Sequence, residues 1–226
     1  QSVTGTGSPL TAATAPALVA YQTVDGTNWK TRINGHTAGN YMLTGDIDAT
    51  PATLSTKAAD FGSIASFSGK FDGMFYTVKN METTGGLFAK TDGATIENIG
   101  VVNSKITGGA AATPAGAIVG EAKDTILSHV YNEGTTTTGA AVYAAALVGK
   151  ATGTNTIEYS YVSDASKAES GTMVGYIPSG EVHIDHSYPN GGALVRKDGT
   201  VTVGVFVFDL LAVQPLNCTF KTAILV

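Results

Sequence analysis

The densest group of side chains that could hold a metal ion is formed by Glu181, His183 and Asp185. If this segment is an extended strand, the three side chains project from one face, because alternate residues of a strand point the same way. Carboxylate and imidazole groups in such a row are typical zinc ligands. Val182 and Ile184 alternate with them and suit an apolar interior. We therefore favour an outward polar row without a metal over a metal site.

A second group, Asp46, Asp48 and Asp72, could gather around calcium, which prefers oxygen ligands. The segment lacks the alternating acidic positions, closed by a glutamate, that mark a full calcium-binding loop. Aspartate side chains also cap turns, and we expect that role here. The sequence thus assigns no metal, no cofactor and no catalytic residue.

The composition limits the classes of partner. The chain has 226 residues, 18 acidic and 13 basic side chains and a formal net charge of -5, and only 14% of its residues are charged. A nucleic-acid binder needs a basic face, so no nucleic-acid partner is expected. No apolar run approaches the ~18 residues of a membrane-spanning helix. A single cysteine, Cys218, excludes an internal disulfide framework and a thiolate metal cluster.

The elements that must position these side chains are short strands separated by glycine turns. The chain contains 28 glycines, and amphipathic helical periodicity is hard to find. Residues 1–20 are rich in small side chains and predict a flexible tail or linker. Because the chain begins at Gln1 without a basic and apolar leader, we expect that a secretion signal has been removed.

Two interleaved series of repeats decide the expected fold. One series is a five-residue apolar unit with a small final residue, found at 116–120, 145–149, 171–175 and, more weakly, 85–89. The other is a set of isoleucines 30 and 31 residues apart, namely Ile96, Ile126 and Ile157. Such a period predicts a solenoid, in which the strands of each coil pair with those above and below at about 4.8 Å.

The fold prediction is therefore all-β. We expect residues 21–195 to form a parallel β-helix and residues 196–226 to form a C-terminal β segment. The expected interior consists of large apolar side chains from both series: Ile96, Ile118, Val119, Ile126, Leu147, Val148, Ile157, Met173 and Val174. A β-sandwich with many short strands is the alternative.

The repeat region also resembles a known family. Residues 67–81 (FSGKFDGMFYTVKNM), followed by 86–89 (GLFA) and 94–99 (ATIENI), are similar to the GLUG-motif repeats of large secreted bacterial surface proteins and adhesins, which have a filamentous-haemagglutinin-like β-helix. Residues 39–48 (GNYMLTGDID) resemble the segment that commonly precedes such repeats. The match extends over residues 29–192.

The resemblance implies a right-handed parallel β-helix that is exported and serves adhesion or cell-surface structure. It implies no catalytic residue. The chain departs from the family pattern at Ala89, where the first repeat usually closes with glycine, and the motifs fade after Gly192. Residues 193–226 therefore lie outside the resemblance.

Enzymes that act on polysaccharides also use β-helices, so fold alone does not decide between the classes. A glycosidase needs two convergent carboxylates, and a lyase needs a base with Arg or calcium near a uronate. Arg occurs only at Arg32 and Arg196, and the carboxylates of the repeats stand singly. We therefore predict a non-enzymatic protein and keep a polysaccharide lyase or glycosidase as the alternative.

The predicted function is that of a secreted structural or adhesive protein at the cell surface, with surface glycans as candidate partners of Tyr159, Tyr161 and Tyr188. A solenoid exposes unpaired strand edges at its ends, and we find no amphipathic capping helix at either end. We therefore expect head-to-tail assembly into a filament or layer. The assembly residues predicted in the C-terminal segment are Val203, Val205, Phe206, Val207, Phe208, Ile224, Leu225 and Val226. The alternative is that residues 196–226 fold back as a cap on their own chain.

Overall fold

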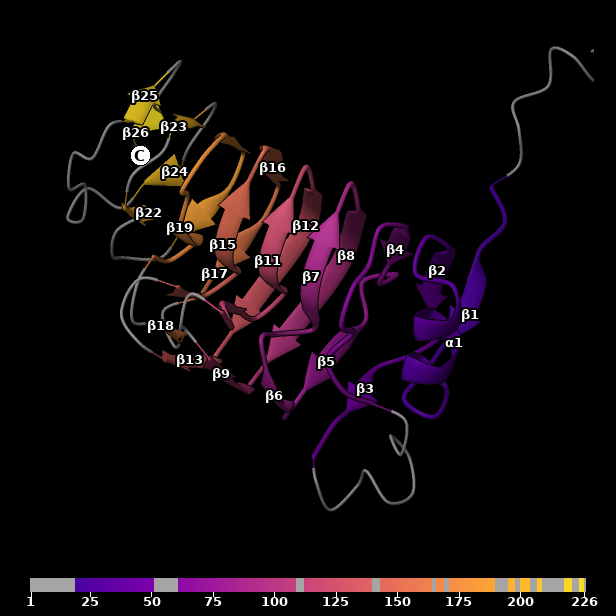
Figure 1. Cartoon of the computed structure of the whole chain (residues 1–226). Coiled ribbons are helices and arrows are strands. Elements are labelled where there is room, and N and C mark those ends of the chain that lie inside the picture. The colour runs from indigo at the N-terminus through magenta and orange to yellow at the C-terminus, as the bar shows by residue number, and fades with distance from the viewer. Residues whose placement is uncertain are drawn as a thin grey trace, which may run out of the picture.

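The chain forms a stack of parallel β coils. The structure, a computed structural model, describes residues 19–50, 61–108, 112–139, 143–163, 166–168 and 171–189. It also describes five short strands between residues 195 and 225. The coils follow one axis from β1 (Gln22–Val24) to β26 (Ile224–Leu225) (Figure 1). Every described strand pairing is parallel. The prediction of an all-β parallel β-helix is confirmed, and the sandwich alternative, whose sheets are antiparallel, is wrong.

The main sheet runs the length of the described chain and contains thirteen strands. Its longest path has the order β1, β2 (Asn40–Leu43), β4 (Lys70–Asp72), β8 (Thr95–Val102), β12 (Ile126–Glu133), β16 (Thr154–Glu158), β20 (Glu181–Asp185), β23 (Thr200–Val203) and β25 (Cys218–Phe220). The strands beside this path are β3 (Ile47–Asp48), β5 (Thr77–Lys79), β17 (Tyr161–Val162) and β21 (Tyr188–Pro189).

Two further sheets complete the walls of the coils in the described chain. The second sheet is formed by β7 (Phe88–Asp92), β11 (Val119–Lys123), β15 (Val148–Thr152), β19 (Val174–Tyr176) and β22 (Val195–Lys197). The third is formed by β6 (Glu82–Thr84), β9 (Lys105–Gly108), β13 (Thr136–Gly139) and β18 (Lys167–Ala168). Two short pairs join β10 (Ala115–Gly116) to β14 (Ala144–Ala145) and β24 (Val207–Phe208) to β26.

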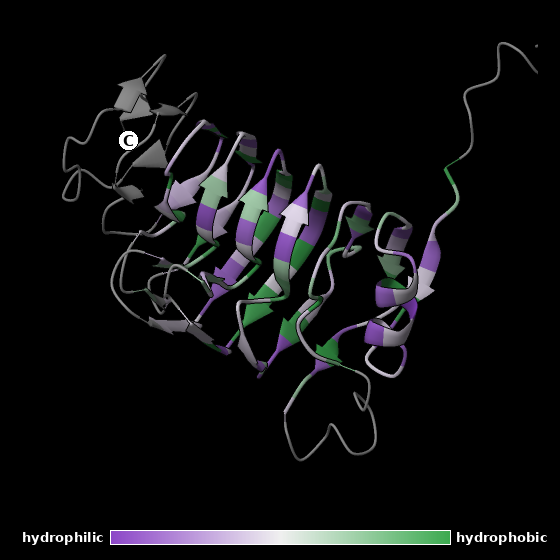
Figure 2. Cartoon of the chain, viewed as in Figure 1, coloured by the Kyte–Doolittle hydropathy of each residue, from purple (hydrophilic) through white to green (hydrophobic). Residues whose placement is uncertain are grey.

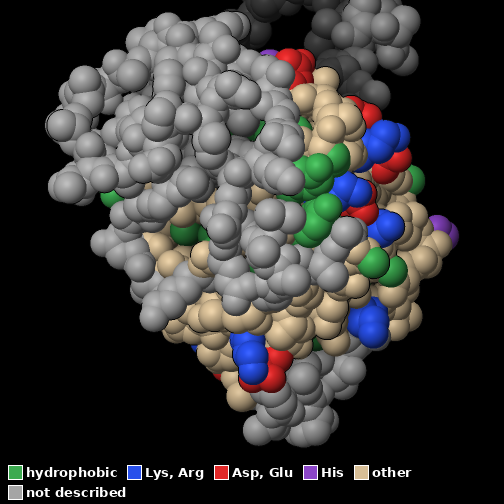
Figure 3. Space-filling model, turned by 60° about the vertical axis from the view of Figure 1, so that its left-hand side comes forward, with side chains coloured by type: hydrophobic (Ala, Val, Ile, Leu, Met, Phe, Trp, Pro, Cys, Tyr) green, Lys and Arg blue, Asp and Glu red, His purple; other side chains and the backbone are tan. Residues whose placement is uncertain are grey.

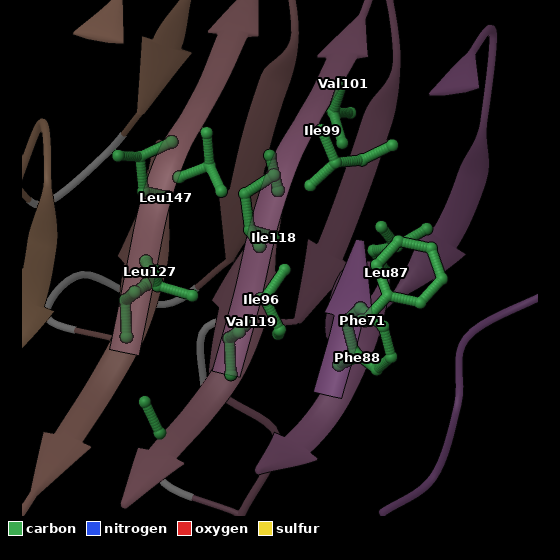
Figure 4. Packing of buried hydrophobic residues seen from close by; sticks show 14 of the residues in the cluster. Phe71, Leu87, Phe88, Ile96, Ile99, Val101, Ile118, Val119, Leu127 and Leu147 are labelled. Atoms are coloured by element: carbon green, nitrogen blue, oxygen red, sulfur yellow. The ribbon is translucent and has the colours of Figure 1, made fainter. Parts of the chain in front are cut away.

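Alternation along the strands places apolar side chains inside the solenoid. In β20, Val182 and Ile184 are fully buried, while the residues between them are partly exposed. The same alternation appears as green and purple bands along the stacked strands (Figure 2). Buried residues of successive coils then lie side by side along the stack, as Ile96 and Leu127 do in Figure 4. Stacking of coils therefore buries one continuous core.

The predicted interior is confirmed at eight of its nine positions and is wrong at Ile126. That side chain is 43% exposed, and Leu127 occupies the inward position beside Ile96 and Ile157. The isoleucine spacing suggested the wrong register by one residue. Because side chains alternate across a strand, a shift of one residue moves an expected core position to the outside.

The N-terminal end of the solenoid is closed by the helix α1 (Trp29–Gly35), contrary to our expectation that neither end has a capping helix. Trp29 and Ile33 are fully buried, and the indole of Trp29 contacts the rings of Phe71 and Phe88. With only two buried positions, the helix is too short to show periodicity in the sequence. No helix of the described residues is long and apolar enough to span a membrane.

The outer edge of β1 is partly covered by a side chain of α1. Nη1 of Arg32 donates a hydrogen bond of 2.9 Å to the carbonyl oxygen of Thr23, the central residue of this edge strand. The carbonyl of Val24 points the other way, toward β2, and accepts the backbone N–H of Thr44. An edge strand is a template for pairing with another chain only where its polar groups are free. The outward carbonyl at the centre of β1 is therefore already occupied by a side chain of the same chain.

The C-terminal strands pair within the chain. In β23, Val201 and Val203 pair with Val182 and Ile184 of β20, and β25 pairs on the other side of β23. β24 and β26 pair through Val207 with Ile224 and Phe208 with Leu225. Of the predicted assembly residues, Val205, Phe206 and Val226 lie outside the described residues. Residues 1–18 of the predicted tail do as well.

Candidate binding face on the main sheet

One corner of the solenoid is turned by residues in the left-handed backbone region. Asn98, His129, Tyr159 and His186 occupy equivalent positions in four successive coils, with φ values of 55°, 53°, 49° and 45°. Asparagine and histidine are enriched in this region, but a tyrosine there is uncommon. Because backbone strain of this kind gathers at functional sites, the corner is the first candidate for a binding surface.

Rings at this corner form what we call the aromatic column: Phe75, His129, Tyr159 and His186. The ring centroids of His129 and Tyr159 are 4.9 Å apart, and those of Tyr159 and His186 are 5.0 Å apart, with interplanar angles of 19° and 23°. Phe75 meets His129 nearly perpendicularly at 6.4 Å. Because the stacked rings cover one another's faces, the column presents mainly ring edges and polar ring atoms to solvent.

A carboxylate column runs beside the aromatic column. The strand register aligns Asp72, Glu97, Ser128, Glu158 and Asp185, one residue from each coil. Neighbouring members are about 4.8 Å apart at the backbone, the spacing of paired strands. Neither Glu97 nor Glu158 has a Lys or Arg partner among the described residues. The two glutamates of this strip therefore carry uncompensated negative charge within the described part of the chain.

A tyrosine column lies on the other side of the rings and consists of Tyr131, Tyr161 and Tyr188. The rings of Tyr131 and Tyr161 stack at 5.0 Å with nearly parallel planes, and Tyr188 pairs with Tyr161 in the next coil. The Tyr161 hydroxyl donates a hydrogen bond to Glu133. Burial, followed by this hydrogen bond and the Glu133 charge, raises the pKa of Tyr161. The phenol therefore stays protonated and remains a donor to Glu133.

Serine hydroxyls hold the corner where the strand ladder is interrupted. Oγ of Ser160 accepts the Val130 N–H at 3.1 Å and donates to the Glu158 carbonyl at 2.7 Å. Oγ of Ser187 repeats this pattern in the next coil, accepting the Ser160 N–H and donating to the Asp185 carbonyl. Buried backbone groups at the turn are thereby satisfied. These bonds fix the backbone that carries the aromatic column.

Exposed apolar side chains gather on the same side. Six large hydrophobic side chains are exposed in the described chain, and every one except Val19 lies on the main sheet or in the turn after β4: Met74, Phe75, Tyr76, Ile126 and Tyr159. Phe75 is 68% exposed, and Tyr159 is 49% exposed. We call this side of the main sheet, with its three columns, the outer face. An exposed apolar patch with polar surroundings is typical of an interaction site.

The second sheet carries a different pattern. Glu121 lies between Lys90 and Lys150, at 3.5 Å and 2.6 Å from their Nζ atoms, and Lys123 pairs with Asp92 at 3.0 Å. Basic and acidic side chains lie next to one another in Figure 3. Burial alone would raise the pKa of Glu121, but the hydrogen bond and charge of Lys150, with Lys90, lower it. Charges on this sheet are therefore matched, unlike those of the outer face.

The row of Glu181, His183 and Asp185 lies on the outer face as expected, but its members do not converge. Nε2 of His183 is 3.2 Å from Glu181, whereas Asp185 contacts Nδ1 of His186 at 2.9 Å. In the described part of the chain no three His, Cys, Asp or Glu side chains are placed to share a metal ion. His183 and His186 instead have one carboxylate neighbour each.

The aspartates considered for calcium serve turns. Oδ1 of Asp48 accepts hydrogen bonds from Thr50 and from the Asn80 amide, and Oδ1 of Asp46 accepts bonds from the N–H and hydroxyl of Thr77. Oδ1 of Asp72 accepts the Met74 N–H and the Asn98 amide, and all of these bonds are 2.6–3.1 Å long. Asp46 and Asp48 line an open cavity of about 510 Å³ with Asp25 and Lys79, and Asp72 does not. The three are therefore not brought together.

The sequence pointed to Tyr159, Tyr161 and Tyr188, which the structure places in two adjacent columns. It missed Phe75, His129 and the carboxylate column, although the intervals of about 30 residues from 98 to 129 and 159 carried the signal. No family model matches the chain, and comparisons with curated proteins and with solved structures found no match.

Proposed function

We propose that the chain is a secreted structural or adhesive protein of the cell surface and that the outer face makes its adhesive contacts, with surface glycans among the partners. The observation that carries the proposal is the gathering of exposed rings and apolar side chains on one face of a rigid solenoid. The resemblance to GLUG-motif repeats in sequence supports the same class. A stack of coils suits this function because it presents side chains at regular intervals over a long surface.

Adhesion is tested by binding of the purified chain to glycan arrays and to cell surfaces. Replacing Phe75 and Tyr159 by alanine should reduce binding strongly, because they are the two most exposed large hydrophobic side chains of the outer face. Val19→Ala is the matched control, since Val19 is an exposed apolar residue outside the outer face. Equal binding by the double variant and the control would contradict the proposal.

Assembly into a filament or layer is the second part of the proposal. Since α1 packs into the core at the N-terminal end and Arg32 occupies an outward carbonyl of β1, we expect the contact to use residues 1–20 of one copy as an added strand on the C-terminal edge of the next. Electron microscopy and light scattering of the chain with and without residues 1–20 test this. A monodisperse monomer at high concentration, unchanged by removal of the tail, would refute it.

An enzyme acting on polysaccharides is the second candidate, and the carboxylate column is the observation that favours it. Glu97 and Glu158 stand two coils apart, about 9–10 Å at the backbone, near the separation of about 6.5–9.5 Å that inverting glycosidases use. A depolymerisation screen on acidic and neutral glycans distinguishes the candidates. Turnover that is abolished by Glu97→Gln or Glu158→Gln would show that the chain is an enzyme and would contradict the adhesive function.

A further inference from the structure

The outer face has an unbalanced charge. Its strands β8, β12, β16, β17, β20 and β21, with the corner residues between them, span 95–102, 126–133, 154–162 and 181–189. These segments contain five carboxylates, Glu97, Glu133, Glu158, Glu181 and Asp185, and no Lys or Arg. Nearer the N-terminus, β4 and β5 of the same sheet add Asp72 with Lys70 and Lys79, so the negative excess lies between β8 and β21. Glu181 and Asp185 lie beside His183 and His186. Glu97 and Glu158, in contrast, have no basic partner among the described residues. A ligand that complements this face carries positive charge.

The face is also periodic. Each coil places one column residue next to one corner residue: Glu97 with Asn98, Ser128 with His129, Glu158 with Tyr159, and Asp185 with His186. The repeat along the axis is about 4.8 Å, set by strand pairing. A surface whose positions recur at a fixed interval, although their residue types vary, matches a polymer that repeats one unit better than it matches the irregular surface of a folded protein.

We propose that the outer face binds an extended polysaccharide of amino sugars with free, protonated amines, whose chain runs along the solenoid axis. The inference rests on the adhesive function proposed above and names its ligand class. The amines donate charge-assisted hydrogen bonds to Glu97 and Glu158. Sugar hydroxyls bond to the Tyr159 hydroxyl and the imidazoles, and the exposed ring of Phe75 covers the apolar side of a sugar.

A lysine-rich polypeptide is the competing cationic ligand. Its backbone groups need hydrogen-bond partners that a face of side chains supplies poorly, and its ammonium groups sit on flexible stems whose ordering costs entropy. A sugar polymer carries its amines directly on rigid rings. The face therefore favours the polysaccharide, and polylysine serves as the probe for the alternative.

The experiment uses the full chain and three soluble probes in calorimetric titrations: glucosamine oligomers, N-acetylglucosamine oligomers of the same length, and polylysine. The acetylated oligomer keeps the rings and hydroxyls but lacks the positive charge, so it is a matched control. We expect binding of the glucosamine oligomer that weakens as salt increases. Equal binding of the acetylated oligomer, or tighter binding of polylysine per charge, overturns the inference.

Two variants locate the site. Glu97→Gln and Glu158→Gln should each weaken glucosamine binding about tenfold, the effect of losing one charge-assisted hydrogen bond of about 1.4 kcal/mol. Glu82→Gln, on the third sheet, is the matched control and should leave binding unchanged. Unchanged affinity in both outer-face variants overturns the inference.

The same titrations separate this inference from the proposed function. If the chain adheres in the glycan and cell assays without preferring free amines, the proposed ligand class is refuted and the proposed adhesive function is retained. Loss of adhesion in every assay refutes both.

Discussion

The rings of Trp29 and Phe71 lie edge to face, with centroids 5.2 Å apart and planes at 75°. This contact joins the capping helix α1 to the core of the first coils, and Nε1 of Trp29 donates to the Gly62 carbonyl at 2.8 Å. The indole therefore closes the apolar interior at the N-terminal end.

Trp29→Ala should lower the free energy of unfolding by about 3–5 kcal/mol, the range for removing a large buried aromatic side chain. Urea unfolding measures the change. Lys30→Ala, in the same helix but outside the core, should change it by less than about 0.5 kcal/mol. If the two variants were equally stable, α1 would not be the cap that the contacts indicate.

Variants at Leu147 and Ile126 test which apolar strand residues face the core and which face the solvent. Leu147 is fully buried in the core, whereas Ile126 is 43% exposed on the outer face. Leu147→Asp should prevent folding at ordinary temperature, because it places an unpaired charge in an apolar stack. Ile126→Asp should leave the chain folded, as shown by circular dichroism. The reverse result would contradict the register of β12 with β8.

The coil architecture was predictable because buried residues repeat at nearly constant intervals. Units such as residues 116–120 and 145–149 occupy equivalent core positions, so their spacing reports the length of a coil. Ile126 was misplaced because consecutive coils differ by one residue, and similarity of type does not reveal such an insertion. The helix α1 was missed because Trp29 and Ile33 alone anchor it.

The outer face was less predictable for a related reason. Columns such as Glu97 with Glu158 join residues of different coils, and only the register places them in line. The residue type at a polar position also varies from coil to coil. In the carboxylate column, for example, one coil has Ser128 in place of an acidic residue. A search for repeated residue types therefore finds the core before it finds the surface.

Gly100 is required by the ring of Tyr131. A Cβ at Gly100 would lie 2.1 Å from a ring carbon of Tyr131, far inside van der Waals contact. Gly100→Ala should therefore displace the ring and destabilise the chain by about 1–3 kcal/mol, as overpacking does.

A double-mutant cycle identifies the cause. In a Tyr131→Ala background, Gly100→Ala should cost much less, because the clashing ring is gone. Equilibrium unfolding of the four proteins gives the coupling energy. Purely additive effects would mean that Gly100 is needed for its backbone conformation and not for the approach of the ring.

Asp48 should make the stability of the chain sensitive to acid. Hydrogen bonds from the Thr50 hydroxyl, the Asn80 amide and the Thr50 N–H lower its pKa from the usual 3.8 to about 2. The unfolded chain therefore takes up this proton at higher pH than the folded chain does. The stabilisation is fully present above about pH 4 and is lost as the pH falls towards 2.

Urea unfolding between about pH 5 and pH 2 measures this loss. Asp48→Asn should flatten the decline in that window, because the titrating group is gone, while Asp25 and Glu121, whose pKa values are also lowered, keep part of the slope. Thr50→Ala should act in the same direction by removing the first hydrogen-bond donor. Thr44→Ala, whose hydroxyl contacts the Val24 carbonyl and no aspartate, is the control. A decline in Asp48→Asn as steep as in the parent chain would show that this carboxylate does not couple folding to pH.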